Sequence, residues 1–331
     1  MLSKLTRRPE KGVVITPPRM DSPDEILFYW NPSITVHKGE TYICFRGYAK
    51  SNVIWQHYSS ILAMSKYVDG KVVGFKRLEP EFPPVGNDSN SLEDVRIWSD
   101  GEKLWGIGNC LTMKKIPSSD TILGRRRNKR GRREGSQAVR RTLNQEQAEA
   151  VIDYDEGTYK IVKRFGNPKG ISEKNWSPID NEPHTYLYGI GVVAHDGQLT
   201  TLSRPLSGNK LHNGTPLILV DDHYIGIFHQ RVSLLNDVHR YSNVFIKFDK
   251  GLRPIEQSDF FIFDDESHQE VQFISGMDLI DNEFWITVGI DRILPSTQAE
   301  YKGLLYKVKP EDIKYKPFDY ENIVIREGKL V

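Results

Sequence analysis

Cysteine is scarce in this chain: Cys44 and Cys110 are the only two among 331 residues. Two thiols build neither a disulfide framework nor a four-cysteine zinc site, so the composition favours a reducing compartment. No apolar run approaches the length that spans a bilayer, and the start, MLSKLTRRPEKG, carries charge without an apolar stretch behind it. We therefore expect a soluble, cytoplasmic protein with no membrane span and no signal peptide.

An excess of charge of one sign is also absent, because 45 basic residues face 44 acidic ones. The whole molecule is therefore not a polyanion binder by its net charge. The exception is the basic segment 123–141, LGRRRNKRGRREGSQAVRR, which self-repels, has no apolar face and predicts a mobile loop. It is either a solvated insertion or an arm that seeks nucleic acid, phospholipid or a phosphorylated substrate. We favour the insertion, because the segment lacks aromatic side chains on which bases stack.

Helical periodicity is almost absent as well, and only 143–150 (LNQEQAEA) predicts a helix. The dominant pattern is a short apolar run, a tight polar turn and a second, aromatic-rich run, as in SITVHKGETYICFRGY and MDLIDNEFWITVGI. Such runs are typical of β-hairpins, and their Asp-Gly and Asn-containing turns supply positive backbone angles.

These hairpins recur about every 40 to 60 residues, which is the scale of a four-stranded propeller blade. The sequence therefore predicts an all-β fold, a five-bladed β-propeller that forms one domain over residues 1–331, with the basic segment as an insertion loop. A pair of β-sandwiches is the alternative. The expected blades are centred on 31–66, 92–155, 175–204, 213–250 and 272–308.

The stretch SLEDVRIW contains a candidate acid. Adjacent carboxylates on a strand point to opposite faces, so we expect Asp94 to share a face with Arg96 and not with Glu93. A carboxylate ordered in this way is suited to proton transfer, although an ordinary salt bridge is the alternative.

Several cationic or donor groups stand at the equivalent ends of other hairpins. Arg46 follows an apolar strand and needs an anionic partner if it is buried. His229 ends an apolar strand and either donates to a phosphate or hydroxyl or is a satisfied core histidine. Blade ends converge on the axis of a propeller, so we expect Asp94 to meet Arg46, Lys174, His229 and Tyr241 there.

The ordered series NPSI…FRGY, EDVR, EKNWSP, NGTPLI…GIFH and FISGMDL…VGID resembles glycoside hydrolase family 130 over residues 28–306. It looks most similar to the relatives that act on β-mannosides as phosphorylases or transferases. The resemblance implies a five-bladed propeller. It also implies that Asp94 is the general acid, which delivers its proton to the glycosidic oxygen through a sugar hydroxyl. Val95 replaces the proline of the family's Glu-Asp-Pro-Arg motif.

The resemblance further implies a substrate site around this acid. The family's phosphate site matches Lys174, His229 and Tyr241, with Arg140 or Arg141 as an additional cation. Asn175 would address a hydroxyl or the backbone, whereas Trp176 packs either the blade, which we favour, or the sugar face. The complete set of expected binding residues is Asn31, Arg46, Arg96, Arg140, Lys174, Asn175, His229, Tyr241 and Asp291.

A single acid beside cations suits inverting attack by phosphate, which is already anionic and needs no base, whereas ordinary glycosidases use two carboxylates. We therefore predict a mannoside phosphorylase or mannosyltransferase with no metal or cofactor. Its co-substrate would be inorganic phosphate or a sugar 1-phosphate, and its partner a mannose-containing oligosaccharide or glycoconjugate.

Three alternatives remain open. The first is a hydrolase with a second acid at Glu93, Glu173 or Asp180. The second is a non-catalytic glycan-binding propeller, and the third, less favoured, is a nucleic-acid-binding protein acting through the basic segment. The sugar, linkage, acceptor and oligomeric state are not predicted.

Overall fold

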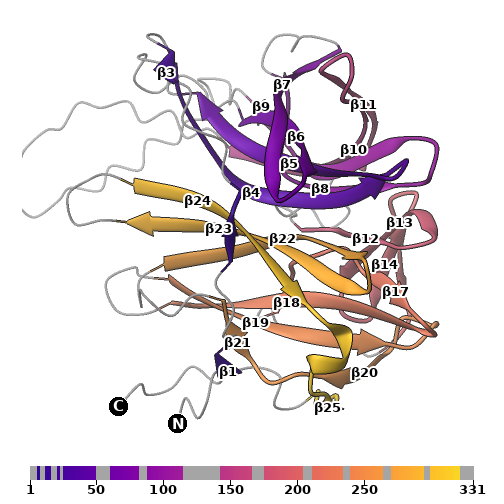
Figure 1. The fold of residues 1–331 in the computed structure, drawn as a ribbon. Helices are drawn as coiled ribbons and strands as arrows, with labels where there is room; N and C mark the ends of the chain where they lie inside the picture. Colours follow the sequence, from indigo (N-terminus) through magenta and orange to yellow (C-terminus); the bar gives the residue numbers. More distant parts are fainter. Residues whose placement is uncertain are drawn as a thin grey trace, which may run out of the picture.

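The computed structural model describes most of the chain, and nearly all of that part is β-strand (Figure 1). Among the described residues the one helical element is the single-turn 3₁₀ helix η3 (Pro310–Asp312). In the same part of the chain no helix has the length and apolar character to cross a membrane. The described residues are 6–7, 12–15, 21–22, 25–49, 60–81, 88–114, 142–165, 175–203, 211–233, 239–263, 270–293 and 299–320.

The first half of the chain forms two antiparallel meanders, in which each strand pairs with the next along the chain. A short parallel bridge between β7 and β11 joins the outer edges of the two meanders into one nine-stranded sheet. We nevertheless call the two meanders the first and second sheets. The first meander contains β3 (Asp21–Ser22), β4 (Glu25–His37), β5 (Glu40–Ala49), β6 (Ser60–Val68) and β7 (Lys71–Pro80). The second contains β8 (Asp88–Ser99), β9 (Leu104–Lys114), β10 (Thr142–Asp153) and β11 (Thr158–Arg164).

The second half forms three further sheets of the same kind. The third sheet contains β12 (Ser177–Ile179), β13 (Glu182–Gly189), β14 (Val192–His195) and β15 (Gln198–Thr201). The fourth contains β16 (His212–Asn213), β17 (Ile218–Val220), β18 (His223–Ser233), β19 (His239–Phe248), β20 (Pro254–Gln257) and β21 (Phe261–Ile262), with β1 (Thr6–Arg7) and β25 (Lys316–Pro317) added at its outer side. The fifth contains β22 (Glu270–Ile280), β23 (Glu283–Ile293), β24 (Ala299–Val308) and β2 (Val13–Val14).

The sheets close into a ring, and the predicted all-β propeller is confirmed. β4 contacts β8 and β22, β8 contacts β12, and β17 contacts β22. Ile179 of β12 pairs with Leu217, directly before β17, and so completes the series of contacts from sheet to sheet. The chain start completes the ring, because Val13 and Val14 of β2 pair with Leu305 and Leu304 of β24 in the last sheet. The described parts of 31–66 and 92–155 lie in the two meanders of the nine-stranded sheet, and those of 175–204, 213–250 and 272–308 lie in the three further sheets.

The hydrophobic core is divided into five clusters, each between two neighbouring sheets. Phe245 of the fourth sheet packs with Phe284 of the fifth, for example, and Phe45 of the first packs near Trp285 of the fifth. Both cysteines are buried in the cluster between the first and second sheets, and burial raises the pKa of the Cys44 thiol to about 12. Each sheet is therefore covered on both faces, as blades in a closed ring must be.

The predicted helix over 143–150 is wrong, because this segment lies inside β10. Its backbone pairs with β9 on one edge and with β11 on the other. Ala148 and Ala150 are fully buried, and so are Gln147 and Glu149 on the opposite face. Intrinsic helix propensity is worth only tenths of a kcal/mol per residue, so pairing and burial on two sides override it. The basic segment 123–141 lies outside the described residues, within the connection between β9 and β10.

Trp176 is a core residue, as favoured from the sequence. Its side chain is fully buried and packs against Phe165, Tyr186 and Tyr188 between the second and third sheets. It therefore anchors the short strand β12 in the ring and presents no face to a ligand.

We expect Trp176→Ala to lower the free energy of unfolding by about 3–5 kcal/mol, because it removes a large buried ring and leaves a cavity. Denaturant unfolding followed by circular dichroism would measure the loss. Val162→Ala is the control: its side chain is 47% exposed, so a change within about 0.5 kcal/mol is expected. Equal effects of the two substitutions would contradict the assignment of Trp176 to the core.

Candidate active site

Two carboxylates of β8 meet one guanidinium of β5 where the first and second sheets face each other. Arg46 of β5 donates from Nη1 to Asp94 Oδ1 at 2.9 Å and from Nη2 to Glu93 Oε1 at 2.8 Å. Asn31 of β4 donates from Nδ2 to the same Asp94 Oδ1 at 2.8 Å. All four side chains are at most about one-tenth exposed. We call Asn31, Arg46, Glu93 and Asp94 the acid cluster.

The backbone bends at both ends of this contact. Asn31 and Asp94 have φ angles of 48° and 51°, in the left-handed region that Asn and Asp tolerate better than most residues. Pairing is interrupted by irregularities in the register between Trp30 and Ser33 and between Glu93 and Arg96. Such bulges re-aim side chains, and strained backbone of this kind gathers at functional sites. Gly289 of β23 makes room for the bend, because a Cβ there would overlap Asn31.

The expected orientation of the EDVR stretch is wrong, because the strand has a bulge at this point. Glu93 and Asp94 were expected on opposite faces, yet both carboxylates contact Arg46. The Asp94 carboxylate is held by Arg46 and not by Arg96, because the positive φ of Asp94 breaks the simple alternation of a strand.

Arg96 is fully buried and joins distant parts of the ring. It donates from Nε to the Gly214 carbonyl at 2.8 Å, from Nη2 to the Asn213 carbonyl at 3.1 Å and from Nη1 to the Asp94 carbonyl at 3.5 Å. Burial lowers its pKa to about 10, partly offset by the nearby Asp94 charge. Arg96 thus clamps the backbone that carries the acid to the backbone that precedes β17.

His229 of β18 lies in the same neighbourhood but is only 2% exposed. The rings of His212, Tyr241 and Phe273 surround it, with centroids 5.6, 5.5 and 5.4 Å away. Burial holds the pKa of His229 well below its usual value; His212 and Arg96 add to this effect, and Asp94 opposes it. Its imidazole is therefore neutral, and its Nδ1 has no hydrogen-bond partner among the described residues.

The structure places the other expected residues less completely. Asn175 lies two residues before the start of β12, is 9% exposed and has a φ of 65°. Asp291 lies in β23, where its backbone pairs with β22 and β24, and only this strand position is described. Lys174 and Arg140 lie outside the described residues, as do Glu173 and Arg141.

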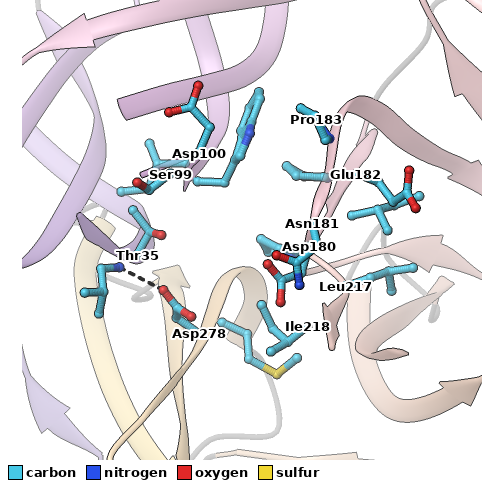
Figure 2. Close-up of a pocket in the computed structure, with 17 residues that line it drawn as sticks. Thr35, Ser99, Asp100, Asp180, Asn181, Glu182, Pro183, Leu217, Ile218 and Asp278 are labelled. Atoms are coloured by element: carbon cyan, nitrogen blue, oxygen red, sulfur yellow. Dashed lines mark hydrogen bonds between the residues drawn. The ribbon is translucent and has the colours of Figure 1, made fainter. Parts of the chain in front are cut away.

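A cavity lies further along the strands that carry the acid cluster. It has a volume of about 390 Å³. Its lining includes residues that follow the acid cluster by four to six positions, among them Thr35 and Val36 of β4, Ser99 at the end of β8 and Asp100 directly after it. Figure 2 shows Asp180 and Asp278 facing the same space from the third and fifth sheets. Four residues of strand span about 13 Å, so this cavity is separate from the acid cluster.

Two carboxyl groups of this cavity are hard to ionise. Burial raises the pKa of Asp278, and the charge of Asp180 raises it further, although the Val36 N–H donates to Asp278 Oδ2 at 2.8 Å. Burial also raises the pKa of Asp180, which accepts a bond from the Leu219 N–H at 3.3 Å. Among the described residues, no three His, Cys, Asp or Glu side chains gather closely enough to hold a metal ion.

The site also contains residues that sequence reasoning undervalued. Glu93 was considered only as a second acid, yet it pairs with Arg46. His212 stands against His229 and was not singled out. Its position one residue before the NGTPLI stretch could have marked His212 as a candidate site residue. The contact between the two rings, however, depends on the pairing of β16 with β18, which the sequence does not show.

The whole chain resembles solved glycosidase and phosphorylase structures in fold. No protein-family model and no curated protein sequence matches it. A glycosyl hydrolase from Bacteroides ovatus is 16% identical, with a TM-score of 0.55 over 92% of this chain and 96% of that one. A structure of the GH130 family of mannoside phosphorylases, which contains glycoside hydrolases that target β-1,2 mannosidic linkages in Candida mannan, is 17% identical, with a TM-score of 0.56 over 90% and 92%.

A mannose phosphorylase from Leishmania mexicana, in complex with a phosphate ion, is 13% identical, with a TM-score of 0.50 over 92% of this chain and 89% of that one. At these identities the likeness concerns the fold. The predicted resemblance to family 130 propellers is confirmed at that level.

We expect Asp180→Asn to stabilise the protein at neutral pH relative to acid pH. Burial raises the pKa of Asp180 and Asp278 in the folded protein. As the pH rises from the pKa of the unfolded chain to that of the folded protein, such a carboxyl group progressively destabilises the fold. The destabilisation then stays constant at higher pH. Asparagine removes this destabilisation at position 180 and the repulsion on Asp278. The gain over the unsubstituted protein should therefore be larger near pH 7 than near pH 4.

Urea unfolding at both pH values measures this difference. Asp222→Asn is the matched control, because Asp222 is exposed and pairs with Lys250, which lowers its pKa. The control should show no gain near pH 7, and the same behaviour of Asp180→Asn would contradict the prediction.

Proposed function

We propose that this protein is a carbohydrate-active enzyme that makes or phosphorolyses β-mannosides by single-displacement inversion, with Asp94 as the general acid. One observation carries the proposal: an aspartate held near the propeller axis, with one carboxylate oxygen bonded to Asn31 and Arg46. The fold shared with mannoside phosphorylases supports it. A structural carboxylate in a core would not need the backbone strain that Asp94 carries.

In this reaction the glycosidic bond between the anomeric carbon and the leaving oxygen breaks, and the leaving oxygen takes the proton of Asp94. An oxygen of phosphate attacks the anomeric carbon from the opposite face, so the product is a sugar 1-phosphate of inverted configuration. In the reverse direction the acceptor hydroxyl gives its proton to the Asp94 carboxylate as phosphate leaves. Phosphate is already anionic, so the scheme needs one carboxyl group and no base.

The proposed phosphate site combines Lys174 and Arg140 with Tyr241 and His229. Because His229 is neutral and buried, it would contribute a hydrogen bond and no charge. Arg46 is already paired with Glu93 and Asp94, and Arg96 is bonded to backbone carbonyls. The positive charge that attracts phosphate would therefore come from Lys174 and Arg140. Asn31, Asn175 and Asp291 would contact the sugar.

Hydrolysis is the second candidate function, because Glu93 gives the acid cluster a second carboxylate. Asp180, also considered as a second acid, lines the separate cavity along the inner strands. The two functions differ in one requirement: a phosphorylase releases sugar 1-phosphate only when phosphate is present, whereas a hydrolase releases free sugar without it.

We expect Asp94→Asn to lower kcat/KM by at least about 100-fold, the usual contribution of a positioned general acid. The assay uses mannose 1-phosphate with a mannoside acceptor and records the release of inorganic phosphate, with mannosides plus phosphate as the reverse assay. Asp196→Asn, at an exposed carboxylate of the third sheet, is the control and should retain full activity.

Full turnover by Asp94→Asn would overturn the role of Asp94. Sugar release at the same rate with and without phosphate would favour the hydrolase. The absence of turnover with all sugar phosphates and mannosides would refute the enzymatic proposal itself.

A further inference from the structure

Glu93 occupies an unusual place for a buried acidic side chain, since it shares one guanidinium with the neighbouring residue along the chain. Its side chain is 5% exposed, and its Oε1 lies 2.8 Å from Arg46 Nη2, while Arg46 Nη1 bonds Asp94. The Arg46 guanidinium also lies over the Trp30 ring, with its carbon 5.3 Å from the ring centroid. The arginine is thus fixed from two sides and cannot turn toward one carboxylate without losing the other.

The charges of this arrangement decide when Asp94 can carry a proton. With both carboxylates ionised, the two acids and the arginine have a net charge of −1. With Asp94 protonated, Arg46 and Glu93 form a neutral pair, and a buried group of net charge zero is the less costly state. With Glu93 neutralised, protonation of Asp94 would remove the second of the two carboxylate charges that Arg46 contacts, so protonation would cost more.

The hydrogen bonds decide which oxygen carries the proton. Asp94 Oδ1 accepts from both Asn31 and Arg46. A carboxylic acid accepts at its carbonyl oxygen and donates from its hydroxyl oxygen, so the two donors on Oδ1 disfavour a hydroxyl at that oxygen.

We propose that Glu93 is a positioning residue for the general acid: through the shared Arg46 its charge favours the protonated form of Asp94, and Arg46 and Asn31 keep that proton off Oδ1. The catalytic part of this inference rests on the proposed function of Asp94. Glu93 itself contacts no reacting atom in this scheme. It supplies the negative charge that a carboxyl group beside an arginine needs in order to act as an acid.

The other charged and titratable groups near Asp94 do not replace Glu93 in this role. Arg96 of β8 is buried and bonded to three backbone carbonyls. His229 of β18 is neutral because of its burial, and His212 of β16 stands behind it. Among the described groups around Asp94, Glu93 is the one that brings negative charge to Arg46.

The test is the titration of Asp94 itself. In protein labelled with ¹³C at the aspartate side-chain carboxyl, the Asp94 resonance is identified by its loss in Asp94→Asn. We expect Glu93→Gln to move its titration to lower pH by about 1–3 units, the usual effect of one nearby charge. We expect Arg46→Gln to move it to higher pH, because the substitution removes the cation that contacts both carboxylates.

Glu149→Gln is the matched control. Glu149 is as buried as Glu93 but pairs with His184 at 2.5 Å between the second and third sheets. It should leave the Asp94 titration unchanged. Equal shifts from Glu93→Gln and Glu149→Gln, or shifts of the same sign from Glu93→Gln and Arg46→Gln, would overturn the proposal. If Glu93→Gln fails to fold, the sign of the shift in Arg46→Gln decides the question alone.

A kinetic measurement then connects the titration to catalysis. In an active enzyme, Glu93→Gln should move the basic limb of the kcat/KM profile to lower pH and retain kcat on the acid side. A uniform loss at all pH values would show a merely structural role and contradict the proposal. If no sugar phosphate or mannoside is turned over, the proposed function fails, whereas the NMR titration still decides whether Glu93 controls Asp94.

Discussion

The candidate site depends on closure of the ring of sheets. Asn31, Arg46 and Asp94 come from two different blades, and Gly214, which receives Arg96, precedes β17 of a third. These blades hold their places because each packs on two neighbours and because β2, from the start of the chain, completes the last sheet beside β24. Opening the interface between the first and second sheets would separate Asp94 from Asn31 and Arg46, which are 63 and 48 residues away in the sequence.

Closure also explains why charges can be buried at the inner strands. The acid cluster places one guanidinium between two carboxylates, and Arg96 has backbone carbonyls as partners. A buried ion is tolerated only when such partners are already in position, because the cost of removing it from water is large. The rigid inner strands supply that pre-organisation, and the left-handed backbone at Asn31 and Asp94 is the strain that accompanies it.

Two separate environments follow one another along the same inner strands. The acid cluster has a cation between its carboxylates, whereas Asp180 and Asp278 face a common cavity (Figure 2), where burial raises the pKa of both and the Asp180 charge adds to the effect on Asp278. Asp278 also accepts the Val36 N–H and thereby joins the fifth sheet to the first. Acidic residues in this protein therefore differ in role according to the donors that reach them, and their spacing in the sequence does not reveal which role each has.

The sequence by itself determined the β-hairpin pattern, the ring-like arrangement of repeated units and the likeness to family 130, because alternation, turn residues and motif order are local properties that survive without coordinates. It also singled out Asp94, Arg46 and Asn31. It failed at 143–150, where burial on both faces overrode helix propensity, and at the EDVR stretch, where a bulge overrode strand alternation. Only the tertiary structure decided that Glu93 and Asp94 share Arg46, that Arg96 bonds backbone carbonyls and that His229 is neutral, because bulges, burial and inter-blade distances arise from packing between segments far apart in the chain.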